Sequence, residues 1–267
     1  MLRRLPDTEG WISMTNQMKT AFTAKKALIP FITAGYPNLG VTQQLLVAAA
    51  HAGADMLEVS IPFSDPVAGG VTIQKADETA LRAGTTTDGV FDMLANVRKQ
   101  IDTPLILMSY MNPIYVYGME RFFARCADCG IDAVSVPDVP YEERELLVPY
   151  CKKYGIQLTE MIVSATKERI RTLAKVAQGF VNCVPIPSKR PEVITDLAEM
   201  IPLIKLEQDI PCVVGCDAGS AEELPPFLQE VDGIIVDTQL VQKIEQYGEN
   251  CIEPCCEYIR TIKQALC

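Results

Sequence analysis

The chain has 267 residues, of which 48% are hydrophobic and 22% charged, a composition typical of a globular protein. A formal net charge of −10 and a pI near 4.7 argue against nucleic acid or an anionic membrane surface as a partner. No apolar run reaches the roughly 18 residues of a membrane span, and the first residues lack the apolar core of a signal peptide. We therefore expect a cytoplasmic protein that binds neither nucleic acid nor membrane.

Apolar, β-rich stretches recur along the chain with helix-like stretches between them. Most are apolar throughout rather than alternating, as is typical of strands buried on both faces. The predicted strands are Ala27–Ala34, Met56–Ile61, Leu105–Tyr110, Ala133–Pro137, Leu158–Val163, Phe180–Ile186, Cys212–Cys216 and Gly233–Asp237. The predicted helices are Val41–Ala52, Asp88–Gln100, Arg121–Cys129, Glu142–Tyr154, Lys167–Ala177, Val193–Lys205 and Ala221–Gln229, with extra helices at Glu9–Thr23 and Pro254–Ala265.

This strand–loop–helix unit repeats without any break in composition that would mark a second domain. The pattern predicts an α/β protein with a single (β/α)8 TIM-barrel domain over residues 1–267 and extra flanking helices. A doubly wound open sheet is the structural alternative. It normally uses fewer strands, and no GxGxxG follows the first predicted strand.

A TIM barrel carries its function at the C-terminal ends of its strands and on the loops that follow them. The longest of these predicted loops follow the second strand, from Ile61 to about Ala76, and the sixth, from Pro185 to Pro191. Polar or aromatic residues at the strand ends are the candidate site residues: Thr33, Glu58, Ser64, Asp65, Tyr110, Asn112, Asp138, Glu160, Asn182, Asp217, Asp237 and Thr238.

Ten cysteines are scattered over predicted strands and helices, which suits small buried side chains in a reducing compartment better than disulfides. Cys126 and Cys129 have the spacing of metal ligands, and Cys255 with Cys256 could complete a zinc site. The chain has one histidine, His51, and no second CxxC pair. We expect no metal and no cofactor.

Several motifs occur in an order and at separations that resemble the tryptophan synthase α subunit family. They read IPFITAGYP, LEVSIPFSDPVAGG, LILMSYMNPIYVYG, GIDAVSVPDVPYEE, GFVNCV, IPCVVG and DGIIVDTQLVQKIEQYG, and together they extend over nearly the whole chain. The resemblance implies a (β/α)8 barrel that splits indole-3-glycerol phosphate by a retro-aldol reaction. It also implies that indole passes to a pyridoxal-phosphate β subunit through an intersubunit contact.

The resemblance also assigns roles to individual residues. Glu58 matches the family's strand-2 glutamate, a general acid–base at C3 of the indole and at the adjoining carbinol. The implied ligand-binding residues are Phe31, Tyr110, Glu160, Asn182, Gly215, Asp217, Asp237 and Thr238. The implied contacts with a β-type subunit are Pro62, Ser64, Asp65, Pro66, Asn112, Pro113, Asp138 and Pro140.

The chain departs from the family at the second catalytic position. Where the family has an acidic residue that contacts the indole N–H, in DP-x-A-[Asp/Glu]-G-P, this chain has Gly69. Removal of a positioned acid–base group typically slows a reaction by about 10²–10⁴-fold.

The phosphate-binding loops depart as well. Asp217 stands at the second glycine of the family's GFGIS, and Asp237-Thr238-Gln239 replaces GSA. A carboxylate roughly 4–6 Å from a phosphate dianion costs several kcal/mol at an effective dielectric constant near 20. The aspartates can also be read as N-caps of the following helices, but a cap occupies the same N–H groups that would bind phosphate.

The loop after the sixth strand is shorter than the family's glycine-rich lid and is braced by Pro185, Pro187 and Pro191, while Asn182 replaces a usual aromatic residue. These departures predict a divergent member with impaired lyase activity that acts as a partner or activator of a β-type subunit.

Two alternatives stay open at this point. One is an active α chain that tolerates the departures. The other is a divergent lyase that uses Glu58 on a non-phosphorylated ligand, with Lys189 and Arg190 countering a set of carboxylates that converge on one mouth. Those carboxylates are Glu58, Asp65, Glu160, Asp217 and Asp237.

Overall fold

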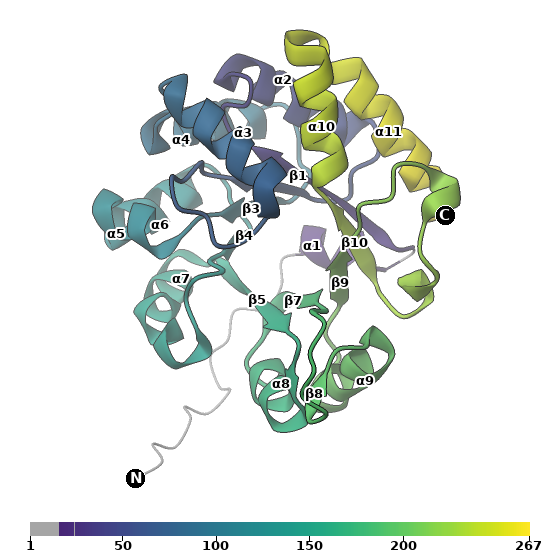
Figure 1. Ribbon diagram of the computed structural model, residues 1–267. Coiled ribbons are helices and arrows are strands. Elements are labelled where there is room, and N and C mark those ends of the chain that lie inside the picture. The colour runs from purple at the N-terminus through teal and green to yellow at the C-terminus, as the bar shows by residue number, and fades with distance from the viewer. Residues whose placement is uncertain (1–15, 24) are drawn as a thin grey trace.

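A computed structural model describes residues 16–23 and 25–267 and contains a closed barrel of eight parallel strands (Figure 1). Around the barrel the strands follow the order β1-β10-β9-β7-β5-β4-β3-β2, and each is paired in parallel with both neighbours. Their bounds are β1 Ala27–Thr33, β2 Leu57–Ser60, β3 Leu105–Met108, β4 Ala133–Ser135, β5 Gln157–Val163, β7 Gln178–Val184, β9 Cys212–Gly215 and β10 Gly233–Val236. The predicted TIM-barrel fold is confirmed, and the open-sheet alternative is wrong.

Helices surround the barrel and cover the outer faces of its strands (Figure 1). The α-helices are α1 Asn16–Ala21, α2 Leu39–His51, α3 Gly70–Arg82, α4 Thr87–Arg98, α5 Met111–Tyr117, α6 Met119–Asp128, α7 Val148–Tyr154, α8 Lys167–Ala174, α9 Leu197–Glu207, α10 Thr238–Tyr247 and α11 Ile252–Ala265. The 3-10 helices are η1 Tyr141–Leu146, η2 Ala221–Glu223, η3 Pro226–Gln229 and η4 Gly248–Asn250.

Each predicted strand is present, with bounds within two residues of the prediction, because continuous apolar runs mark strands that are buried on both faces. The predicted C-terminal flanking helix is confirmed as α11. Of the predicted helix Glu9–Thr23, the part up to residue 15 lies outside the described residues, and the rest contains α1.

Two predicted helices are wrong in part. In the stretch predicted as Ala221–Gln229, Pro225 and Pro226 interrupt the chain, and two short 3-10 helices form instead. Val193 and Ile194, predicted as helical, form strand β8 (Val193–Ile194), which pairs antiparallel with β6 (Ala165–Thr166). Helix α9 begins only after Asp196, whose carboxylate accepts a hydrogen bond from the Ala198 N–H.

Helices α3, α5 and α10 were not predicted, and all three begin in loops at the C-terminal ends of strands. The predicted helix Glu142–Tyr154 is divided between η1 and α7, with Pro149 in the first turn of α7. No helix in residues 16–23 and 25–267 has both the length and the apolar sequence needed to cross a bilayer.

The buried core has two parts. The larger part lies between the strands and the helical layer, and the smaller one fills the barrel interior. Met18 of α1 belongs to the interior cluster and is fully buried, while Phe22 lies near Phe180 with ring centroids 6.2 Å apart. Side chains therefore fill the barrel interior, and the open space lies at the C-terminal ends of the strands.

Candidate active site at the barrel mouth

A pocket of about 600 Å³ lies at the C-terminal ends of the strands. Its wall is mostly apolar, with contributions from Met108, Met161, Val214 and Ile235. Five of the predicted catalytic or ligand-binding residues line it, together with the departure position Gly69: Phe31, Glu58, Asn182, Gly215 and Asp237. Residues at the C-terminal ends of β1, β2, β7, β9 and β10 therefore line one cavity, as expected for a TIM barrel.

Glu58 is the buried carboxyl of this pocket. It pairs in register with Phe31 of β1, so both side chains point into the barrel, and its residue is only 6% exposed. Burial, followed by the negative charge of Asp237, raises the pKa of Glu58 to about 7. A carboxyl with that pKa can both donate and accept a proton near neutral pH.

Asp237 and Asp217 form a carboxyl cluster beside Glu58. The Asp237 carboxylate accepts hydrogen bonds from the Thr238 backbone N–H and, at 3.1 Å, from the Thr238 hydroxyl, which makes it the N-cap of α10. Burial and a hydrogen bond with Asp217 raise the pKa of Asp237 to about 6. The N–H group that opens α10 is therefore occupied by a carboxylate of the chain itself.

Gly69 has a backbone conformation that disfavours the acidic residue of the family. Its φ is +98°, and it is the N-cap residue of α3 without a side chain to cap it. A Cβ atom at this position would lie 2.9 Å from Cβ and from Cγ2 of Ile73. The loop is thus fitted to glycine, so an aspartate here requires the backbone and Ile73 to shift.

The rim on the side of β2–β4 is held by side chains that bind backbone groups. The buried Tyr110 hydroxyl lies 3.1 Å from both the N–H and the carbonyl oxygen of Ala68, accepting from the first and donating to the second. The Asp138 carboxylate accepts the Met111 N–H at the start of α5, at 2.9 and 3.1 Å. Both residues thus brace the rim, and neither lines the pocket.

Several predicted site residues lie away from the pocket. Glu160 faces a separate cavity on the helical side of β5, and Thr238 serves as the first residue of α10. The interpretation that Glu58, Asp65, Glu160, Asp217 and Asp237 all converge on one mouth is therefore wrong in part. Glu58 and Asp237 line the pocket, whereas Asp65 and Asp217 do not, and Glu160 faces the side of β5 opposite to its neighbour Met161. Asp65 is exposed on the loop after β2, where its carboxylate accepts the Ser64 hydroxyl at 2.6 Å.

The predicted β-facing residues are mostly at the surface. Ser64, Asp65, Asn112, Asp138 and Pro140 are exposed, and Pro66 and Pro113 are half-buried. Pro62 is buried, so it supports the loop rather than offering a surface contact.

The loop after β7 is attached at both ends. Ile186 N–H donates to the Ser164 hydroxyl at 2.7 Å, and Val193–Ile194 pair with Ala165–Thr166. Lys189 and Arg190 are exposed on it and do not line the pocket.

Asp77 is an acidic residue that the sequence pattern did not predict as part of a site, and α3 buries it beneath the loop after β2. The residue is 2% exposed, and burial raises its pKa to about 7 although a hydrogen bond from the Phe63 N–H acts in the opposite direction. The sequence could have indicated the burial of Asp77, because its spacing from Ile73 and Ala80 puts all three residues on one helix face.

All ten cysteines are free thiols, and nine of them are buried. Cys126 and Cys129 lie near Cys151, whereas Cys255 lies beside Cys251, so the two cysteine pairs do not assemble into one zinc site. Within residues 16–23 and 25–267, no group of three or more His, Cys, Asp or Glu side chains is placed to hold a metal ion.

Comparison with known proteins agrees with this geometry. A family profile described as "Tryptophan synthase alpha chain" matches residues 17–266. The tryptophan synthase alpha chain of Bacillus cereus (strain AH820) is 34% identical over 253 residues, which cover 93% of this chain and 97% of that protein. The chain therefore belongs to the tryptophan synthase alpha chain family.

Solved structures give the same result. The tryptophan synthase alpha chain of Legionella pneumophila subsp. pneumophila superposes with a TM-score of 0.83 at 30% identity, covering 94% of this chain and 97% of that one. A chain of the tryptophan synthase complex of Pyrococcus furiosus gives a TM-score of 0.80 at 28% identity, covering 89% and 98%.

Proposed function

We propose that this protein is an α-type partner and activator of a tryptophan synthase β-type subunit, with an impaired indole-3-glycerol phosphate lyase site of its own. The observation that carries the proposal is the Asp237 carboxylate, which is hydrogen-bonded to Asp217 and caps the N-terminus of α10, where the family resemblance implies a phosphate. A phosphate dianion there would meet two carboxyl groups and compete for an N–H that is already bonded.

The second support is Gly69. The carboxylate that would contact the indole N–H is missing, and the φ of +98° together with the closeness of Ile73 fits the loop to glycine. In this proposal Glu58 is the retained catalytic carboxyl, without a partner acid at the other end of the substrate.

A partner role uses the rim rather than the pocket. Four large apolar side chains on the loop after β2, the start of α3 and α5 are each more than 70% exposed: Val67, Val71, Tyr115 and Val116. Tyr110 ties the loop to the start of α5, which keeps this apolar surface in one arrangement. The relative from Pyrococcus furiosus was solved in a tryptophan synthase complex, and we assign the rim to the contact with such a β-type subunit. Nine buried free thiols further favour a reducing cytoplasm.

The test is indole release from indole-3-glycerol phosphate, with and without a β subunit, measured beside the Bacillus cereus alpha chain. We expect release at least about 100-fold slower than from that enzyme, since one acid–base group is absent. We also expect faster β-catalysed conversion of added indole when this chain is present. Glu58→Gln should remove residual lyase activity and leave the effect on the β subunit unchanged.

One observation favours the alternative of a lyase acting on a non-phosphorylated ligand: Glu58 has a pKa of about 7 and faces an apolar pocket of about 600 Å³. Lyase rates equal to those of the Bacillus protein, lost in Glu58→Gln, would instead identify an ordinary active α chain and contradict the proposal.

A further inference from the structure

Two carboxyl groups line the pocket at the barrel mouth, those of Glu58 and Asp237. No lysine, arginine or histidine is among the described residues of its wall, and the amide and hydroxyl side chains there, Asn182 and Ser135, are uncharged. Within residues 16–23 and 25–267 neither carboxylate forms an ion pair. An ionised carboxylate in this pocket therefore lacks a counterion from the described chain.

The carboxylate of Glu58 is buried and yet faces the open space of the pocket. The residue is 6% exposed, and its carboxylate has no hydrogen bond to any described residue. Unlike the Oδ1 atom of Asn182, which is shut off from solvent without a partner, the Glu58 oxygens keep accessible surface and open onto the pocket. Because buried polar groups are almost always hydrogen-bonded, this carboxylate is placed to bind a molecule that enters the cavity.

The strand register puts an aromatic ring between the two carboxyl groups. Phe31 of β1 pairs with Glu58 of β2 on one side. On the other side Pro30 pairs with Val236 of β10, so Asp237, the next residue, comes level with Phe31. The negative charge of Asp237 acts on Glu58, which agrees with this placement. A cationic group bound to Glu58 therefore also meets a second carboxyl group and an aromatic ring, and both attract cations.

We propose that the barrel mouth binds an organic ammonium ion with an apolar body. The ammonium group donates hydrogen bonds to Glu58, and the body packs against the apolar wall, which includes Met108, Met161, Val214 and Phe227. The inference rests on the same carboxyl groups as the proposed function and gives the chemical class of ligand that they accept.

Other classes of ligand fit this pocket less well. An anion would be repelled by both carboxylates, and a neutral molecule would leave the buried carboxylate of Glu58 without a counterion. A simple inorganic cation would leave the apolar wall unused. About 600 Å³ is within the usual range for small-molecule sites, so an amine with an aromatic ring has enough room.

Amine binding should be linked to the ionisation of Glu58. Burial raises the pKa of Glu58 to about 7, so about half of these carboxyl groups are protonated at pH 7. A bound ammonium group favours the ionised form, so binding should release a proton and should strengthen from pH 6 to pH 8. An anionic ligand would show the opposite dependence. The other titratable groups in the pocket wall or next to it are Asp237, Asp217, Cys183, Tyr110 and Asp77.

The test is isothermal titration calorimetry of the full chain at pH 8 with matched small molecules. 2-Phenylethylamine carries both the ammonium group and an apolar body. 2-Phenylethanol has a hydroxyl in place of the ammonium group, phenylacetate ends in a carboxylate, and methylamine has the ammonium group without the body. We expect 2-phenylethylamine to bind with a Kd below about 1 mM and each of the others to bind at least about tenfold more weakly.

Glu58→Gln removes the carboxylate at nearly constant size. It should weaken the binding of 2-phenylethylamine at least about tenfold and remove the pH dependence between pH 7 and 8, which separates Glu58 from the other titratable groups. Asp237→Asn keeps a side chain that can cap α10 and should weaken binding by a smaller factor.

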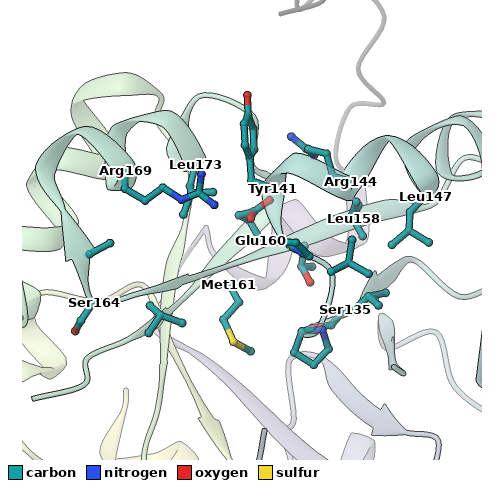
Figure 2. A pocket seen from close by; sticks show the side chains of 17 residues that line it. Ser135, Tyr141, Arg144, Leu147, Leu158, Glu160, Met161, Ser164, Arg169 and Leu173 are labelled. Atoms are coloured by element: carbon teal, nitrogen blue, oxygen red, sulfur yellow. The ribbon is translucent and has the colours of Figure 1, made fainter. Parts of the chain in front are cut away.

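Glu160→Gln is the matched control. Figure 2 shows Glu160 and Met161 extending from opposite sides of β5 at the neighbouring cavity beneath η1. Burial raises the pKa of Glu160 to about 7, as it does for Glu58, but Glu160 does not line the pocket at the mouth. Glu160→Gln should therefore leave amine binding unchanged. Circular dichroism of each variant checks folding, and Asp237→Asn with the pH dependence decides if Glu58→Gln does not fold.

No heat of binding with 2-phenylethylamine at about 10 mM would overturn the inference. So would equally tight binding of 2-phenylethanol, phenylacetate or methylamine, since the charge or the apolar body would then play no part. Binding that is unchanged in Glu58→Gln would overturn it as well, because the amine would then lie elsewhere. These results concern amine binding alone, whereas the proposed function fails on rapid cleavage of indole-3-glycerol phosphate, so the two failures are distinguishable.

Discussion

The two halves of the barrel mouth use their polar residues differently. On the side of β2–β4, Tyr110 and Asp138 bind backbone groups of Ala68 and Met111 and so hold the rim in shape. On the side of β9 and β10, Asp217 and Asp237 bind each other, and Asp237 caps α10. The first half brings one carboxyl group into the pocket, that of Glu58 on β2, and the second places Asp237 next to it.

This difference means that one half of the mouth holds the shape of the rim and the other sets the charge of the pocket. Hydrogen bonds to the backbone keep the rim and its exposed apolar side chains in place whatever the pocket contains. The carboxyl groups of the other half decide the charge of any ligand that can enter, because a buried carboxylate repels an anion strongly. One half can therefore serve a protein contact while the other excludes the substrate phosphate.

The largest effect should follow from removal of the carboxyl cluster. Asp217→Gly combined with Asp237→Gly removes two carboxyl groups and frees the Thr238 N–H at the start of α10, so glycerol phosphate should bind about 100- to 1,000-fold more tightly. In the unchanged protein, binding should strengthen as the pH falls from 8 to 5.5, because Glu58 and Asp237 become protonated near pH 7 and 6. Calorimetry at several pH values measures both effects. An ordered phosphate at pH 8 in the unchanged protein would remove the contrast between the halves.

Asp77 is a second buried acid on the β2–β4 side of the mouth, besides Glu58. Its pKa is about 7 when folded and near 3.8 when unfolded, so folding takes up a proton between these values and stability falls as the pH rises through them. Asp77→Asn should therefore stabilise the protein by about 2–3 kcal/mol at pH 8 and have little effect at pH 4. Urea unfolding at both pH values measures this. Glu78→Gln, on the exposed face of the same helix, is the control, and an equal gain there would contradict the assignment.

Gly69→Asp tests whether the loop after β2 can regain the missing acid. The φ of +98° and the contact with Ile73 should make this substitution cost about 1–3 kcal/mol, with little gain in indole release while the phosphate side keeps its carboxyl groups. Gly70→Asp separates the two causes, because Gly70 also has a positive φ, of 66°, but a Cβ atom there would have no neighbour within 4 Å. Thermal unfolding of both variants gives the comparison. Full lyase activity in Gly69→Asp alone would mean that the carboxyl cluster does not exclude the substrate.

Tyr110→Phe should have the smallest effect, and it acts on the rim alone. Loss of the hydroxyl removes two hydrogen bonds to Ala68 and should cost about 1–2 kcal/mol. Hydrogen exchange at the Ala68 amide should accelerate, and activation of the β subunit should weaken because the apolar rim is less ordered. Tyr115→Phe removes an exposed hydroxyl nearby and should leave the exchange unchanged. Equal exchange in the two variants would show that Tyr110 does not hold the loop.

The sequence by itself determined the barrel, its strands and most of the residues that line its mouth. Continuous apolar runs identify buried strands, and parallel strands in a barrel present their C-terminal ends on the same side, so Glu58, Asn182 and Asp237 could be placed together from the sequence. Helix α3 was missed because the loop after the second strand was predicted to extend to about Ala76, although Ile73, Ala76 and Ala80 lie on one helix face, and α5 was missed because its seven residues are too few for a clear apolar period.

Only the tertiary structure decided which way each side chain faces and what it binds. A one-residue change of register turns a strand residue to the opposite face, so the direction of Glu160 depended on the pairing of β5 with β7. The burial of Asp77 and the bond between Asp217 and Asp237 likewise depend on contacts between different elements of the fold. Local sequence patterns do not predict such contacts, because the apolar period of a segment indicates its secondary structure and not the segments that pack against it.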